Sequence, residues 1–185
     1  MGAQAQVAGS IGGGFGTFLE LSSAGLSGGS VATLAGGTVY TTDQPFADIP
    51  AGSIFGGDFL AAGPTSGAPA TLSFNGGGID YISFLWGSPD SYNVLTVTST
   101  GGTQTFTTAT LGLPGNGDQS FSRYVQFAGL DGNKITSLTF NNLPATDAFE
   151  SANYSITAVP EPETYALLLA GLAAVGFVAR RRRSA

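Results

Sequence analysis

The chain has 185 residues, contains no cysteine and no histidine, and carries a formal net charge of −6 at pH 7. Histidine is the commonest general base and metal ligand, and cysteine supplies thiol nucleophiles, thiolate zinc sites and disulfides, so this composition excludes most familiar catalytic constellations. The length suits one domain, and a hydrophobic fraction of 42% with only 10% charged residues excludes disorder caused by high charge.

Charge is distributed unevenly along the chain. The residues before Pro160 include ten acidic and two basic residues, a net charge of −8, whereas four arginines stand together near the C-terminus. Contacts from lysine and arginine to phosphate groups dominate nucleic-acid affinity. We therefore expect no nucleic-acid partner.

The N-terminal segment 1–14 begins MGAQAQVAG and shows no basic region followed by an apolar stretch. Ala3-Gln4-Ala5 has the A-x-A form of a signal-peptidase site. We expect this segment to be a flexible remnant of a signal-peptide region whose leader is missing upstream. The alternative is that these alanines are ordinary residues of a flexible terminus.

Residues 15–159 alternate apolar and polar side chains in short runs that glycine, proline and asparagine interrupt. This pattern is typical of an all-β sandwich or barrel. The expected strands are residues 15–22, 38–41, 70–75, 79–86, 92–99, 103–109, 122–128, 134–141 and 153–158. We predict one antiparallel β-sandwich domain over residues 15–159, jelly-roll or galactose-binding-like in type.

Two details of this pattern predict positions within a sheet. Gly101-Gly102 lies between two Thr-rich alternating runs and predicts a tight hairpin. Residues 79–86 are largely apolar on both faces, so this strand is expected in the middle of a sheet.

The stretch 83–93, with the sequence SFLWGSPDSYN, is the most distinctive part of the domain. In one interpretation it is a hairpin corner with Trp86 in the core and turn-forming side chains after it. In the other, Trp86 or Tyr92 stacks on a sugar while Asp90 and Asn93 hydrogen-bond its hydroxyl groups. The sequence leaves both interpretations open.

Carboxylates are the only general acid or base candidates present in number. They are Asp80, Asp90, Asp118, Asp131, Asp147 and Glu150. A pair of them would suit glycoside hydrolysis, and together with Asn93 or Asn153 they offer oxygen ligands for calcium, which takes six to eight. No EF-hand spacing occurs, and a G-x-S-x-G match at residues 25–29 has no histidine as its base. We expect no catalytic residue, no cofactor and no metal site, with calcium as the weaker alternative.

The C-terminal segment 160–185 opens with Pro160-Glu161-Pro162. Proline lacks a backbone donor and restricts the residue before it, so this motif stops a preceding strand and favours an extended backbone. An extended segment of this kind fits a protease-like cleft.

An uncharged run at residues 165–179 follows the motif. As a helix it would be about 22 Å long at about 1.5 Å per residue, somewhat short of a ~30 Å hydrocarbon core. We predict a transmembrane helix whose flanking residues help it to span. A basic cluster follows this run. By the positive-inside rule, the cluster should stay in the cytoplasm and place residues 15–159 on the outer side of the membrane. The cluster consists of Arg180, Arg181, Arg182 and Arg183.

The order of Pro-Glu-Pro, apolar helix and basic cluster resembles the PEP-CTERM sorting signal of bacterial exosortase systems. This resemblance implies that a membrane-embedded exosortase recognises Pro160, Glu161 and Pro162, cleaves the chain nearby and releases or transfers the body to the cell surface. These residues would then form a substrate site. Such proteins are cargo of Gram-negative bacteria that make exopolysaccharide and biofilm matrix.

Two stretches of the body resemble sequences in a family of exosortase-dependent surface proteins. One is WGSPDSYN at residues 86–93, and the other is FESAN at residues 149–153, where that family often has F-E-x-D-N. Ala152 stands at the acidic position. If this acid serves a cation in relatives, its replacement weakens calcium binding here.

We therefore expect an exported, non-enzymatic surface or matrix protein that exosortase sorts and that associates with exopolysaccharide. It would be anchored in the inner membrane before processing and lie at the cell surface or outside the cell afterwards. A carbohydrate-binding module with a specific glycan ligand is the alternative. A carboxylate-based glycoside hydrolase is a weaker one.

Overall fold

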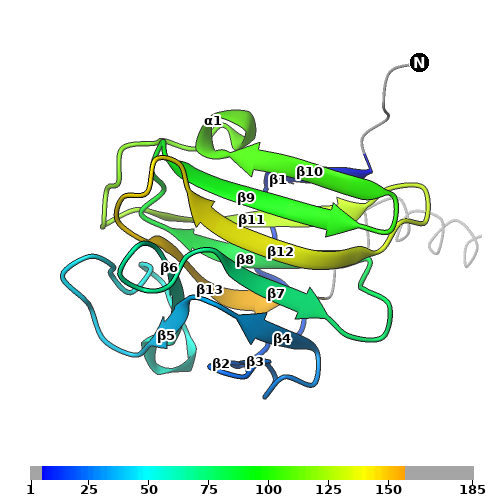
Figure 1. The fold of residues 1–185 in the computed structure, drawn as a ribbon, viewed down its shortest axis with the longest axis horizontal. Helices are drawn as coiled ribbons and strands as arrows, with labels where there is room; N and C mark the ends of the chain where they lie inside the picture. Colours follow the sequence, from blue (N-terminus) through cyan, green and yellow to red (C-terminus); the bar gives the residue numbers. More distant parts are fainter. Residues whose placement is uncertain (1–5, 157–185) are drawn as a thin grey trace, which may run out of the picture.

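The computed structural model describes residues 6–156, which fold into two antiparallel β-sheets (Figure 1). The first sheet has six strands in the order β1 (Val7–Ile11), β11 (Ser122–Gly129), β8 (Tyr81–Gly87), β13 (Phe149–Ser155), β6 (Phe59–Ala62) and β5 (Thr38–Tyr40). The second has seven, in the order β10 (Gly102–Thr107), β9 (Asn93–Ser99), β12 (Ile135–Asn142), β7 (Ala70–Phe74), β4 (Ala32–Ala35), β3 (Gly25–Leu26) and β2 (Leu21–Ser22).

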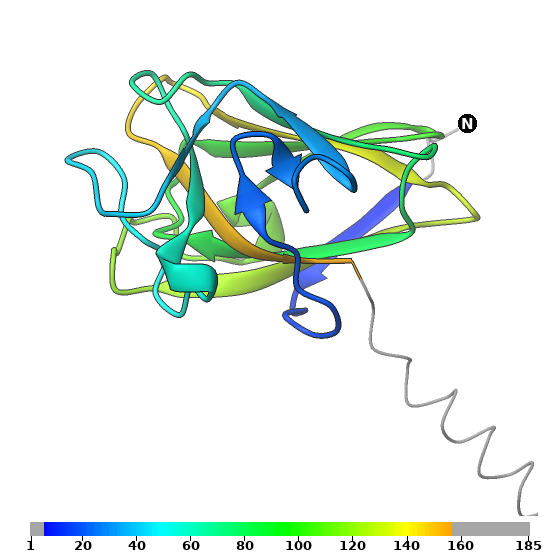
Figure 2. The same cartoon turned by 90° about the horizontal axis from the view of Figure 1, so that it is seen from below.

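The two sheets form the layers of a sandwich, which Figure 2 shows from the side. Strand β8 lies inside the first sheet between β11 and β13, as its two apolar faces predict. Strands β9 and β10 form the predicted hairpin. Its turn sits one residue earlier than expected, because Ser99 pairs with Gly102 and the turn falls on Thr100 and Gly101.

Aromatic rings from both sheets fill the inner core between the layers. Phe84 of β8 lies at its centre, with ring centroids 5.9 Å from Phe127, 5.5 Å from Phe140 and 5.6 Å from Tyr154. All four side chains have no exposed surface. Offset and edge-to-face contacts of this kind add to the free energy gained by burial. No disulfide is available, so this packing and the strand pairing hold the sheets together.

A second cluster lies on the outer face of the first sheet, beneath the segment 41–58. This outer cluster consists of Ala47, Phe59, Ala61, Ala148 and Ala152. Its members on β6 alternate with Leu60 and Ala62, which belong to the inner core. Strand β6 is therefore buried on both faces.

The only helices among residues 6–156 are short: η1 (Phe55–Gly57) and α1 (Thr108–Leu111). Helix α1 replaces the end of the strand expected at residues 103–109. Thr107 is its N-cap and forms a capping box with Thr110, and Gly112 ends it in a left-handed conformation. This reciprocal capping favours the helical turn over continued strand pairing.

The all-β prediction is confirmed in this part of the chain, and several finer expectations are corrected. The flexible segment predicted through residue 14 is wrong for residues 7–11, which form β1 and pair with β11. Of the strand expected at residues 15–22, only β2 forms. Strands β4 and β6 were not predicted because their alanines have low β-propensity. The jelly-roll or galactose-binding-like type stays a prediction.

Candidate functional site

The predicted glycan residue Trp86 belongs to the inner core. Its side chain has no exposed surface, and its ring stacks on Phe149 with centroids 4.2 Å apart. The indole Nε1 donates a hydrogen bond to Asn93 Oδ1 at 3.2 Å. The stacking of Trp86 on a sugar is therefore wrong, because the residues of both sheets already cover the ring.

Asn93 is also buried and organises the corner that follows β8. Its Oδ1 accepts a second hydrogen bond from the Asp90 backbone N–H at 2.8 Å, and its Nδ2 donates to Asn142 Oδ1 at 3.0 Å. Asn142 Nδ2 in turn donates to the carbonyl groups of Ala62 and Asp147. Asn93 has no exposed surface for a glycan, so its predicted binding role is wrong and its role is structural.

Asp90 and Tyr92 are the two predicted glycan residues that stay partly exposed. The Tyr92 hydroxyl donates a hydrogen bond to Asp90 Oδ2 at 2.7 Å. Burial, followed by this bond to the carboxylate, raises the pKa of Tyr92 above its ordinary value. Tyr92 therefore keeps its proton at neutral pH and presents a neutral phenol beside a carboxylate.

Glu150 is the most deeply buried carboxyl among the described residues. It points to the outer face of β13 with 4% of its surface exposed, and its Oε2 accepts a hydrogen bond from Ser88 Oγ at 2.9 Å. Burial raises the pKa of Glu150 to about 8, and the Asp90 and Asp48 carboxylates add to this rise while the Ser88 bond opposes it. Glu150 is therefore largely protonated at neutral pH.

The other acidic candidates are spread over the surface. Lys134 Nζ lies 2.6 Å from Asp80 Oδ1. Asp118 accepts hydrogen bonds from Ser120, which hold the pKa of its carboxyl below the ordinary value. Asp131 lies in the turn before β12 with a φ of 53°. Within residues 6–156, no three acidic side chains come together as metal ligands, so the calcium alternative gains no support there.

Asn153, the other residue considered for calcium, clamps three elements instead. It sits at an irregularity in the pairing of β13 with β8 and has a φ of 52°. Its Oδ1 accepts from the Ile54 backbone N–H at 2.9 Å, and its Nδ2 donates to the Gly52 carbonyl at 3.0 Å and to the Tyr124 hydroxyl at 2.9 Å. Asn153 thus fixes the segment 41–58 against β11.

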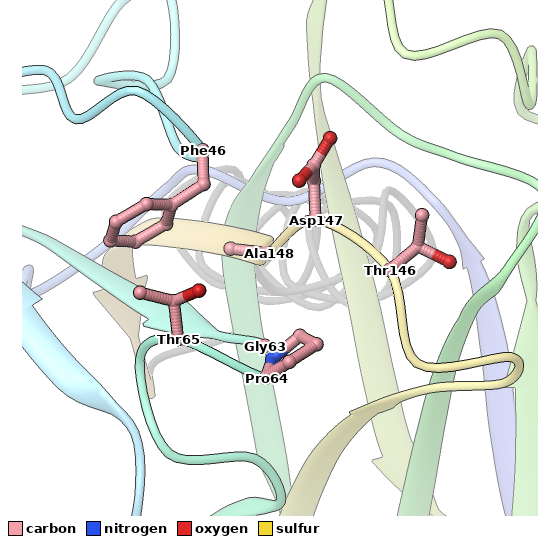
Figure 3. A pocket seen from close by; sticks show the side chains of 7 residues that line it. All are labelled: Phe46, Gly63, Pro64, Thr65, Thr146, Asp147 and Ala148. Atoms are coloured by element: carbon pink, nitrogen blue, oxygen red, sulfur yellow. The ribbon is translucent and has the colours of Figure 1, made fainter.

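Two of the hollows on the described surface are candidate binding sites. The smaller has a volume of about 190 Å³, with Phe46 and Thr65 on one side and Thr146 and Asp147 on the other (Figure 3). The larger, here the Arg123 groove, has a volume of about 470 Å³ and is lined by Ile11, Gly12, Ala51, Gly52, Leu85, Ser122, Arg123 and Tyr124.

Asp147, which lines the smaller hollow, is the only predicted site residue that lines one of these two hollows. The Arg123 groove was not predicted from the sequence, because the residues that line it lie far apart in the chain. One sequence signal was available, since Arg123 is the only arginine before the C-terminal cluster.

The G-x-S-x-G match at residues 25–29 is structural. It spans β3 and the turn that leads to β4, with Ser27 at a φ of 51°. A nucleophile elbow needs a turn from a strand into a helix, and a strand follows here.

The predicted sorting residues lie outside the described part of the chain. They are Pro160, Glu161 and Pro162, the helix expected at 165–179, and Arg180 to Arg183. Within residues 6–156, no helix has the length and apolar character to cross a membrane.

Residues 158–183 match the family model of the PEP-CTERM protein-sorting motif. The match contains the Pro-Glu-Pro motif, the apolar run and all four arginines. No curated protein and no solved structure matches the chain.

Proposed function

The chain is an exported protein that carries a PEP-CTERM protein-sorting motif for exosortase-dependent sorting, and from this premise we propose that its body is a non-enzymatic component of the cell surface or extracellular matrix. The order of signals in residues 158–183 carries the proposal. A Pro-Glu-Pro motif, whose prolines favour an extended backbone, precedes an apolar run long enough to enter a bilayer, and a basic cluster is expected to hold the far end in the cytoplasm.

In this proposal the tail acts once and is then removed. The run 165–179 anchors the exported chain in the inner membrane as a helix. Exosortase recognises Pro160-Glu161-Pro162, cuts near it and separates the acidic body from the four arginines. The body then reaches the cell surface or the matrix, where it associates with exopolysaccharide.

The described body supports a structural role outside the cell. Aromatic packing between two sheets closes it without disulfides or a metal site among the described residues. A glycoside hydrolase needs two carboxyl groups flanking its substrate. Glu150, the one deeply buried carboxyl among the described residues, accepts a hydrogen bond from Ser88 and lines neither hollow.

The sorting step is tested by changing Pro160, Glu161 and Pro162 to alanine in cells with an active exosortase. Full-length protein should accumulate in the inner membrane, and the released form should disappear from the surface fraction, as followed by immunoblotting of fractions. Processing and release equal to those of the unchanged protein would refute the proposal.

A matched control places three alanines in the exposed turn of the body. Asn116, Gln119 and Ser120 are exposed and far from the sorting motif in sequence, so this variant should be processed normally. Association with exopolysaccharide is tested in a strain that lacks the polymer. There the processed protein should move from the matrix fraction into the medium, and unchanged retention would contradict that association.

A further inference from the structure

The Arg123 groove is built on strands β8 and β11 and closed by two glycine-containing loops. Leu85 and Tyr124 come from paired positions of these strands, and Gly12 and Gly52 contribute from the loops. The Gly12 backbone N–H donates to the Tyr124 carbonyl at 2.9 Å. The Asn153 clamp fixes Gly52 to the Tyr124 hydroxyl, so both loops are held before any ligand arrives.

Glycine is required where the first loop crosses Tyr124. Gly14 has a φ of 75°, and a Cβ added there would lie 2.8 Å from the Tyr124 ring. The loop therefore packs directly on the ring. This contact holds Tyr124 in place, and its hydroxyl, which accepts one hydrogen bond from Asn153, retains its own proton to donate.

Arg123 is the distinctive charge of this groove. It is exposed, and within residues 6–156 it has no ion-pair partner, whereas Lys134, the only other basic residue in that range, is paired with Asp80. The neighbouring strands place little negative charge near Arg123. Glu150 lies on β13, which β8 separates from β11, and its carboxyl is largely protonated at neutral pH. The groove is therefore a cationic spot on an acidic body.

We propose that the Arg123 groove binds a carboxylated saccharide, with the guanidinium of Arg123 bound to the carboxylate. This inference rests on the proposed association with exopolysaccharide and specifies its chemistry: the polymer contains uronic acid units. The planar guanidinium fork matches a carboxylate through two parallel hydrogen bonds.

The walls of the groove favour a sugar over a compact anion. Ile11 is 39% exposed, and it lines the groove together with Leu85. An apolar surface beside a few fixed polar groups suits the C–H face of a sugar ring. An inorganic phosphate would not cover the apolar surface, which would stay exposed to water.

The test is titration calorimetry of the full-length chain in detergent with trigalacturonate, which carries carboxylates, and with maltotriose, which is neutral. The chain should bind trigalacturonate and bind maltotriose at least about tenfold more weakly, since charge-assisted hydrogen bonds supply the difference. Arg123→Gln should weaken trigalacturonate binding about tenfold, and Arg123→Lys should weaken it less because one charge but no fork remains.

Lys134→Gln is the matched control, because it removes the other cation of the body and should leave binding unchanged. Equal affinity of the unchanged protein and Arg123→Gln for trigalacturonate would overturn the proposal. So would equal affinity for the two sugars, absence of binding, or equally tight binding of triglutamate, which would show that the groove selects carboxylates and not sugars.

Failure of this inference is distinguishable from failure of the proposed function. If the chain is processed and retained by exopolysaccharide while its groove ignores trigalacturonate, the groove assignment is wrong and the function stands. If alanines at Pro160-Glu161-Pro162 leave processing unchanged, the sorting function is wrong regardless of the titration.

Discussion

Strand β13 separates two cores of different chemistry. On its inner face, Phe149 and Tyr154 pack among the aromatic rings between the sheets. On its outer face, Ala152 belongs to the outer cluster beneath the segment 41–58, and Glu150 is buried on the same face. Every residue of the strand is buried, yet one face excludes charge and the other encloses a carboxyl group.

The difference shows how each core is held. The inner core is closed by ring packing, which depends little on pH. The outer cluster is covered by a loop, which is fixed by hydrogen bonds such as those of Asn153, and the same face of β13 holds the Glu150 carboxyl, which burial keeps protonated. We therefore expect the inner core to set the overall stability and the outer cluster to set its dependence on pH.

The largest effect is expected from Trp86→Ala in the inner core. The substitution empties a fully buried site and leaves Asn93 Oδ1 without its indole donor. We expect the free energy of unfolding to fall by about 5 kcal/mol, the upper end of the range for such truncations. Urea denaturation measures it. Trp86→Phe, which keeps most of the packing, should lose far less, and equal losses would contradict the assignment of Trp86 to the core.

The next effect concerns Glu150 and pH. The unfolded glutamate has a pKa of about 4.3, and burial raises that of the folded protein to about 8. Between these values the folded chain holds a proton that the unfolded chain has released. The free energy of unfolding should therefore fall as pH rises through this window, by at most about 5 kcal/mol, and level off above it.

Glu150→Gln isolates this contribution, because the amide is neutral at every pH. Urea denaturation between pH 4 and pH 9 should show similar stability of the two proteins at the acidic end and a more stable variant near pH 8. Parallel profiles across the whole range would contradict the buried, protonated state of Glu150.

Asn93→Ala tests the polar rim of the inner core. It leaves two donors, the buried Trp86 indole and the partly buried Asp90 backbone N–H, without their shared acceptor. We expect a loss of about 3 kcal/mol in urea denaturation. Asn116→Ala, at an exposed position, is the control and should change stability little. If Asn93→Ala lowers the free energy of unfolding no more than the control does, the structural role of Asn93 is wrong and Asn93 is again a candidate binding residue.

The smallest effect is expected at the clamp of the outer cluster. Asn153→Gly removes three side-chain hydrogen bonds, and glycine accepts the φ of 52° without strain. The overall loss should be about 1 kcal/mol. Hydrogen exchange should nevertheless accelerate across residues 50–57 and not in β8. Uniform acceleration would show that the clamp supports the whole sandwich.

The sequence predicted features that depend on residues close together in the chain. The apolar faces of residues 79–86 indicated a central strand, and the Thr-rich runs around Gly101-Gly102 indicated a hairpin one residue from its observed turn. Residues 158–183 were readable in the same way, because a sorting signal is recognised as an extended motif, an apolar run and a basic cluster in linear order.

The sequence could not choose between the two interpretations of residues 83–93. Trp86 suits a core and a sugar-binding surface equally well, and the choice required Phe149 and Asn142, which lie about 50 residues or more away. Nor could it show that the alanines of β6 are buried on both faces, because this depends on the segment 41–58 folding over the first sheet.

By itself, then, the sequence determined the all-β class of the body and its export address, since strand periodicity and a linear sorting signal are both local properties. Only the tertiary structure decided which polar residues are structural and which are free. The fold buried Trp86 and Asn93, which removes them from the candidate glycan residues, and it buried the Glu150 carboxyl. Among residues 6–156 it gave Arg123 no ion-pair partner. Burial and ion pairing depend on neighbours that the fold brings together from distant parts of the chain.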